Sequence, residues 1–112
     1  MITFNPEGYK KLLQSLVHNY QVVTFDQAVD IKSSELTGVC CLRHDIDYCL
    51  NTALKMASVE KDSNIFSSYF FLVDSDYYNV LSERSAAIIS EISQMGHEIA
   101  LHFNIAGYPI VK

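Results

Sequence analysis

Two aspartates that close a short apolar run are the residues in this sequence best suited to chemistry. Asp45 and Asp47 are two positions apart, so in an extended chain their carboxylates point to the same side. Two like charges this close favour one of two arrangements: a cation lies between them, or one of them exchanges protons as a base. A structural alternative is that one aspartate pairs with Arg43, which shares their side, or caps the helix that follows.

Two histidines form the second candidate group. His97 and His102 are five positions apart, and an odd offset in a strand sends their rings to opposite faces, so one metal ion cannot easily bind both. His102 falls at the C-terminal end of an expected strand, at the same edge as Asp45 and Asp47. We therefore expect His102 to be the ligand candidate and His97 to make a structural hydrogen bond. His44 is expected to be packed or bonded to the backbone.

The spacing of apolar residues predicts the elements that must position these groups. Apolar residues at steps of three and four indicate helices, and short β-prone runs indicate strands. The expected helices cover residues 9–20, 24 to 31 with a capping box at 24–27, 50–61, and 82–95 with Gly96 as a stop. The expected strands cover residues 22–23, 39–45, 65–73 and 97–101. This alternation predicts an α/β fold in which βαβ units build a parallel sheet.

Composition narrows the class of protein. The chain has 112 residues, of which 49% are hydrophobic, so we expect one folded domain, smaller than a complete α/β barrel. The net charge of −5 argues against nucleic-acid binding and favours a neutral or small-molecule partner. We see no run of about 18 apolar residues that would span a membrane. Three cysteines, an odd number, are expected to be free, buried thiols, and the location is expected to be cytoplasmic.

Four short segments, taken in order, carry a resemblance to a known family. They are Leu42-Arg43-His44-Asp45-Ile46-Asp47, Ser68-Tyr69-Phe70-Phe71-Leu72, Tyr78-Asn79 and Gly96-His97-Glu98-Ile99-Ala100-Leu101-His102. Over residues 39–104 this order resembles the N-terminal half of NodB-like polysaccharide deacetylases. It is most similar to the branch among polysaccharide biosynthesis proteins, in which Asp-x-Asp replaces an adjacent Asp-Asp pair. The resemblance implies that residues 1–112 form one domain, a partial β/α barrel belonging to a larger deacetylase domain.

The resemblance also implies roles for the candidate residues. Asp45 would be the general base, and Asp47 and His102 would be ligands of a divalent metal, usually zinc in this family. Such a metal polarises an acetyl carbonyl and acidifies the attacking water. The family has a second histidine four positions after the first, where this chain has Ala106, so the resemblance leaves the third protein ligand unassigned. The family's general-acid histidine would lie beyond Lys112, so we expect this chain to hold only part of the active site.

Three functions are compatible with these residues. The leading hypothesis is a metal-dependent hydrolase that removes acetyl groups from an amino sugar in polysaccharide biosynthesis. The alternative is a non-catalytic binding or assembly module that retains the deacetylase-like scaffold. A metal phosphohydrolase ranks last, because we find no Gly-rich phosphate-binding loop. Since a partial barrel leaves a strand edge open near the aromatic run 69–71, we also expect a homo-oligomer.

Overall fold

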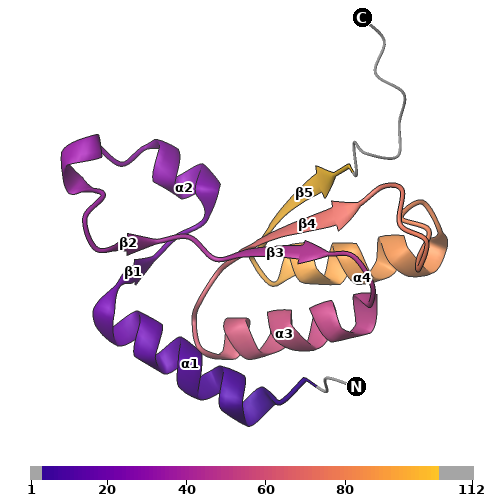
Figure 1. Cartoon of the computed structure of the whole chain (residues 1–112), viewed down its shortest axis with the longest axis horizontal. Coiled ribbons are helices and arrows are strands. Elements are labelled where there is room, and N and C mark those ends of the chain that lie inside the picture. Colours follow the sequence, from indigo (N-terminus) through magenta and orange to yellow (C-terminus); the bar gives the residue numbers. More distant parts are fainter. Residues whose placement is uncertain (1–3, 104–112) are drawn as a thin grey trace, which may run out of the picture.

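The computed structural model describes residues 4–103 of the chain. Helices and strands alternate along most of this range (Figure 1). In chain order they are α1 (Pro6–Asn19), β1 (Gln21–Val22), α2 (Phe25–Val29), the 3₁₀ helix η1 (Ser33–Glu35), β2 (Val39–Cys40), β3 (Arg43–Ile46), α3 (Leu50–Asp62), β4 (Ser68–Leu72), α4 (Glu83–Gln94) and β5 (Glu98–His102). The chain is therefore of the mixed α/β class.

All the strands in this part of the chain are parallel to their partners. One sheet has three strands in the order β3-β4-β5, and the other has the two strands β1 and β2. Helices α3 and α4 connect the three strands and lie together below the sheet in Figure 1. The predicted parallel pairing is confirmed, and within residues 4–103 the strands form two small sheets without closing a barrel.

The prediction of one continuous strand over residues 39–45 is wrong. The run divides into β2, which pairs with β1, and β3, which pairs with β4. Cys41 and Leu42 lie between them, where the chain passes from one sheet to the other. The two strands have different distant pairing partners, and this difference separates them.

Local capping signals set several helix boundaries. The side chain of Thr24 accepts a hydrogen bond from the Gln27 amide, and the Gln27 side chain accepts one from the Thr24 amide, so the predicted capping box is confirmed. Helix α2 ends at Val29, two residues earlier than expected. Ser82 caps α4 as predicted. Helix α1 begins at Pro6, ahead of the apolar stripe that starts at Tyr9, and Asn5 caps it by accepting a bond from the amide of Gly8.

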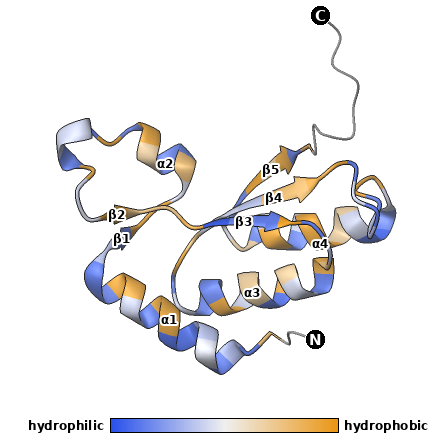
Figure 2. Ribbon diagram, viewed as in Figure 1, coloured by the Kyte–Doolittle hydropathy of each residue, from blue (hydrophilic) through white to orange (hydrophobic). Residues whose placement is uncertain are grey.

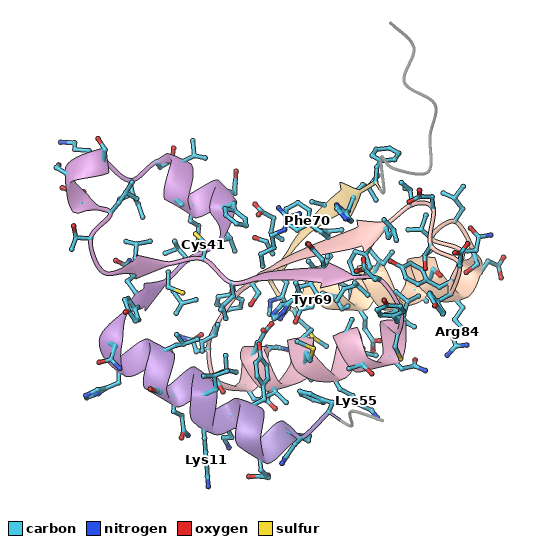
Figure 3. The ribbon with its side chains drawn as sticks, in the orientation of Figure 1. Lys11, Cys41, Lys55, Tyr69, Phe70 and Arg84 are labelled. Atoms are coloured by element: carbon cyan, nitrogen blue, oxygen red, sulfur yellow. The ribbon has the colours of Figure 1, made fainter. Side chains whose placement is uncertain are left out.

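The hydrophobic core lies between the three-stranded sheet and its two helices. Tyr69 and Phe71 of β4 point toward the helices and are fully buried, whereas Phe70 points to the opposite side (Figure 3). Paired residues on neighbouring parallel strands share a face, so the register assigns each side chain to one side of the sheet. We call the side that carries Asp45, Phe70 and Ala100 the outer face, and the side packed on α3 and α4 the helix face.

Two features distinguish the outer face from the helix face. Figure 2 shows that β3 is largely hydrophilic, unlike the second half of β4. Its outer-face residues Arg43 and Asp45 are exposed, whereas Ile46 on the helix face is buried. Helix α2 approaches the outer face near the start of β4 and β5: the Phe25 and Phe70 rings meet edge to face, and the Asp26 amide donates to Glu98. The C-terminal strand ends on this face are therefore the place where a ligand can approach.

Two further expectations concern the state of the cysteines and the presence of a membrane-spanning helix. Cys40, Cys41 and Cys49 are free, as predicted, but none is fully buried and Cys49 is exposed, so their predicted burial is wrong. Within residues 4–103, every helix is too short or too polar to cross a membrane.

Candidate active site

Asp45, Asp47 and His102 lie at one edge of the three-stranded sheet, the edge formed by the C-terminal ends of its strands. Asp45 lies opposite Phe70 and Ala100, and His102 lies opposite Leu72. Asp47 follows the last residue of β3 and so reaches the level of His102, two strands away. At about 4.8 Å per strand spacing, the backbones of Asp47 and His102 are roughly 10 Å apart. The expected common edge is therefore present on the outer face, while the roles of the three residues stay a prediction.

Asp45 has a partner on its own strand. Its Oδ1 atom lies 2.7 Å from Nε of Arg43, and the guanidinium of Arg43 in turn lies 3.8 Å from the centre of the Phe70 ring. The structural alternative of a pair with Arg43 is thus the arrangement present for Asp45. Both side chains are nearly half exposed, so the pair adds little stability and mainly orients the carboxylate.

The loop between β4 and α4 holds the end of β3 in place. The hydroxyl of Ser75 donates to the backbone carbonyl of Asp47 over 2.9 Å. The hydroxyl of Tyr78 donates to the carbonyl of Ile46 and accepts a bond from the amide of Leu72, so it links the ends of β3 and β4. These bonds join two loops at the edge that carries the candidate residues.

The donor set at this edge is of the zinc type but is not complete in the described residues. Asp47 offers a carboxylate and His102 an imidazole, which are ordinary zinc ligands, and a catalytic zinc normally has three protein ligands. Among residues 4–103, no group of three or more His, Cys, Asp or Glu side chains could hold a metal ion. Ala106, which stands where the family has its next histidine, lies outside the described residues.

A small pocket of about 190 Å³ opens beside the two aspartates. Asp45 and Asp47 line it together with Tyr48 and Cys49, and the first turns of α3 supply the remaining wall, including Thr52. The pocket shows that both carboxylates border one accessible space. Neither aspartate caps α3, because the N-cap position of that helix is Cys49.

A second cluster, on the helix face, surrounds a fully buried carboxylate. The Oε2 atom of Glu60 lies 2.6 Å from Nε2 of His44 and also accepts a hydrogen bond from the hydroxyl of Tyr9. Its Oε1 atom accepts a bond of 2.5 Å from the hydroxyl of Tyr69. The ring of His44 packs against Tyr69, which is one of the two roles expected for it, and its hydrogen-bond partner is the carboxylate of Glu60.

The electrostatics of this cluster are consistent with an ionised Glu60. Burial by itself would raise the pKa of the Glu60 carboxyl, but the hydrogen bond and charge of His44, with the hydroxyls of Tyr69 and Tyr9, hold it below its ordinary value. Burial and the negative charge of Glu60 raise the pKa of both Tyr9 and Tyr69 well above the usual range. Both tyrosines are therefore neutral donors to a buried negative charge.

Glu60 was not predicted as a special residue, although the sequence contains a signal for it. It continues the stripe of Leu50, Ala53 and Ala57 on α3, and those three residues are buried. A glutamate on a buried stripe requires hydrogen-bond partners, because an unpaired buried carboxylate is very costly. The sequence could therefore have indicated the polar cluster, but not its members.

His97 connects α3 to the start of β5. Its Nδ1 accepts a hydrogen bond from the amide of Ser67 and its Nε2 donates to the carbonyl of Ala57, at 3.1 and 2.9 Å. Nδ1 also lies 3.8 Å from Oε1 of Glu60, but it accepts the hydrogen bond of the Ser67 amide and so has no proton to share with that carboxylate. Both ring nitrogens are occupied, which confirms the predicted structural role.

Comparison with known proteins gives no relative for this chain. No protein-family model matches it, and neither a curated protein nor a solved structure does. The resemblance to polysaccharide deacetylases therefore rests on the order and spacing of the sequence motifs.

Proposed function

We propose that this protein is a metal-dependent hydrolase of the polysaccharide deacetylase type, which removes acetyl groups from an amino sugar in cytoplasmic polysaccharide biosynthesis. The observation that supports this best is that Asp45 and His102 lie on one face at the C-terminal end of a parallel sheet, with Asp47 directly after the end of β3 and beside the same pocket as Asp45. Ligands of parallel α/β sheets bind beyond the C-terminal strand ends. The two small sheets would then be part of a partial β/α barrel.

Each residue at this edge has a role in the proposed reaction. Asp47 and His102 would bind the divalent metal, which we take to be zinc and which, when bound, polarises the acetyl carbonyl and acidifies the attacking water. Asp45 would accept the proton of that water. Arg43 would orient Asp45 by holding its Oδ1 atom, and Ser75 would position Asp47 through its backbone carbonyl.

A zinc titration and an assay of acetate release test this proposal together. Calorimetry should show zinc binding that is at least about tenfold weaker in Asp47→Asn and in His102→Gln than in the parent protein. Asp45→Asn should keep zinc binding and lose the release of acetate, with formation of free amino groups, from oligomers of N-acetylglucosamine. His18→Gln, at an exposed position of α1, is the matched control and should change neither. Equal zinc affinity in the parent and both ligand variants would contradict the proposal.

A non-catalytic binding or assembly module is the second candidate. Two observations favour it: Asp45 is engaged with Arg43, and the described residues contain no three-ligand metal group. This module would bind saccharide without zinc and would not remove its acetyl groups. The two candidates therefore differ in their response to a chelator, since only the hydrolase loses its function when zinc is removed.

A further inference from the structure

Two tyrosines beside the candidate site are mostly exposed. Tyr48 is 66% exposed and Tyr77 is 67% exposed, and their ring centres are only 4.7 Å apart, in an edge-to-face arrangement. They come from different loops, the first following β3 and the second following β4. Exposed aromatic rings gathered at one place are typical of a surface that binds a ligand.

Hydrogen bonds order both tyrosine loops before any ligand binds. The hydroxyl of Ser75 accepts a bond from the amide of Tyr77 and donates to the carbonyl of Asp47, the residue before Tyr48. One hydroxyl therefore connects the backbones on which the two rings are carried. A binding surface that is already ordered loses less conformational entropy when a ligand arrives.

The tyrosine pair borders a pocket next to the two aspartates. This pocket has a volume of about 310 Å³, and Tyr48 and Cys49 are shared between it and the smaller pocket lined by Asp45 and Asp47. Its volume is at the lower end of the range of roughly 300–1,000 Å³ that is usual for small-molecule sites. The two pockets adjoin, so one extended ligand could occupy both.

Polar side chains complete the wall of the larger pocket. Besides the tyrosines, the lining includes Asn51, Asn79, Ser82 and Arg84, the last of which lies near the start of α4 (Figure 3). Asn79 is held in orientation, because its Oδ1 accepts a bond from the amide of Leu81. The wall thus combines aromatic rings with amide, hydroxyl and guanidinium groups.

This combination matches the chemistry of a sugar ring. A pyranose has C–H bonds on its faces, which pack on the electron-rich face of an aromatic ring, and hydroxyls around its edge, which pair with amides, hydroxyls and guanidinium groups. A purely apolar ligand would make no use of the amide and guanidinium groups of the wall, and a simple anion would make no use of the tyrosines.

We propose that Tyr48 and Tyr77 form a saccharide subsite, which binds the sugar unit next to the one held at Asp45 and Asp47. The identity of the ligand as a saccharide rests on the proposed function, whereas the subsite itself rests on the tyrosine pair and its pocket. The substrate is then an oligosaccharide of at least two units.

Titration of the protein with N-acetylglucosamine and its dimer and trimer, in the presence of a chelator, tests the subsite. Binding followed by calorimetry and by NMR should tighten about tenfold or more from one unit to three. Tyr48→Ala and Tyr77→Ala should each weaken binding of the trimer about tenfold, and Tyr48→Phe should retain most of the affinity because the ring remains. Tyr20→Ala is the matched control, at a tyrosine that is 48% exposed beyond the end of α1.

The outcomes separate this inference from the proposed function. Trimer binding that is absent, or unchanged in both alanine variants, would overturn the subsite whatever the zinc titration shows. Tyr20→Ala should bind the trimer as well as the parent does, because Tyr20 lines neither of the two pockets. Tyrosine-dependent trimer binding in a protein without zinc affinity would uphold the subsite and reject the hydrolase.

Discussion

His44 on β3 and Glu60 on α3 are joined by a contact of 2.6 Å between Nε2 and Oε2 on the helix face of the sheet. His44 immediately precedes Asp45, whose side chain points to the outer face. The buried cluster of Tyr9, His44, Glu60 and Tyr69 therefore holds the same strand that carries the candidate base. Stability of the fold and position of the site depend on one short segment.

Glu60→Gln should destabilise the protein by about 1–3 kcal/mol, because an amide cannot accept the hydrogen bonds of Tyr9, His44 and Tyr69 as a carboxylate does. Denaturant unfolding followed by circular dichroism measures this loss. The control is Glu91→Gln at an exposed position of α4, which should change stability by less than about 0.5 kcal/mol. Equal losses of unfolding free energy in the two variants would show that the buried cluster does not stabilise the fold more than an exposed glutamate does.

Stability should also fall as the pH is lowered through the acid range. In the fold, the pKa of Glu60 lies below its ordinary value, since the favourable bonds from His44, Tyr69 and Tyr9 outweigh the opposing effect of burial. Between the two pKa values the unfolded chain binds more protons, so the contribution of Glu60 is complete above about pH 5 and is lost as the pH falls through its folded pKa. The unfolding free energy measured over this range should decline less steeply with falling pH in Glu60→Gln than in the parent protein. Identical slopes would contradict a lowered pKa of Glu60 in the folded protein.

His97→Gln should leave zinc affinity unchanged and lower stability by about 1–3 kcal/mol, because both ring nitrogens form structural hydrogen bonds, with the amide of Ser67 and the carbonyl of Ala57. Calorimetric zinc titration and denaturant unfolding on the same preparation measure both quantities. His102→Gln is the matched comparison and should show the reverse pattern, with zinc binding reduced and stability nearly unchanged. A folded His97 variant that has lost zinc binding would refute the division of roles between the two histidines.

Gly96→Ala should destabilise the protein by about 1–3 kcal/mol. Gly96 has φ of 102°, and a Cβ at this position would lie 2.9 Å from Cε1 of Phe66. Thermal unfolding measures the effect. Gly8→Ala, in the first turns of α1, provides a control of opposite sign: its Cβ would meet only the side chain of Asn5 at ordinary contact distances, so it should stabilise slightly. Similar behaviour of the two alanine variants would reject this explanation.

The chain should self-associate through the edge of β5. In residues 4–103, β5 pairs only with β4, and an apolar pocket of about 510 Å³ lies beside this edge, lined by residues that include Leu81, Ile99 and Leu101. Unpaired strand edges next to apolar surface promote association. Light scattering after size-exclusion chromatography should give a mass that rises with concentration, and Leu101→Lys should prevent this rise. Leu12→Lys, at an exposed position of α1, is the control. A monomer at every concentration would contradict the prediction.

The sequence by itself determined the features that depend on near neighbours along the chain. The capping box at Thr24, the N-cap at Ser82 and the stop at Gly96 involve residues within about four positions of one another, so their chemistry can be read directly. Alternation of helices and strands predicted parallel pairing, and parallel pairing in turn places strand ends at one edge. The common edge of Asp45 and His102 follows from that order.

Only the tertiary structure decided which distant side chains meet. Glu60 bonds His44 across 16 positions and Tyr9 across 51, and no periodicity in the sequence specifies such partners. The division of residues 39–45 into two strands likewise depends on distant partners, because β1 pairs with β2 and β4 pairs with β3. Local hydrogen bonds and hydrophobic spacing are encoded within a few residues, whereas burial of a charge and pairing of strands depend on the arrangement of the whole chain.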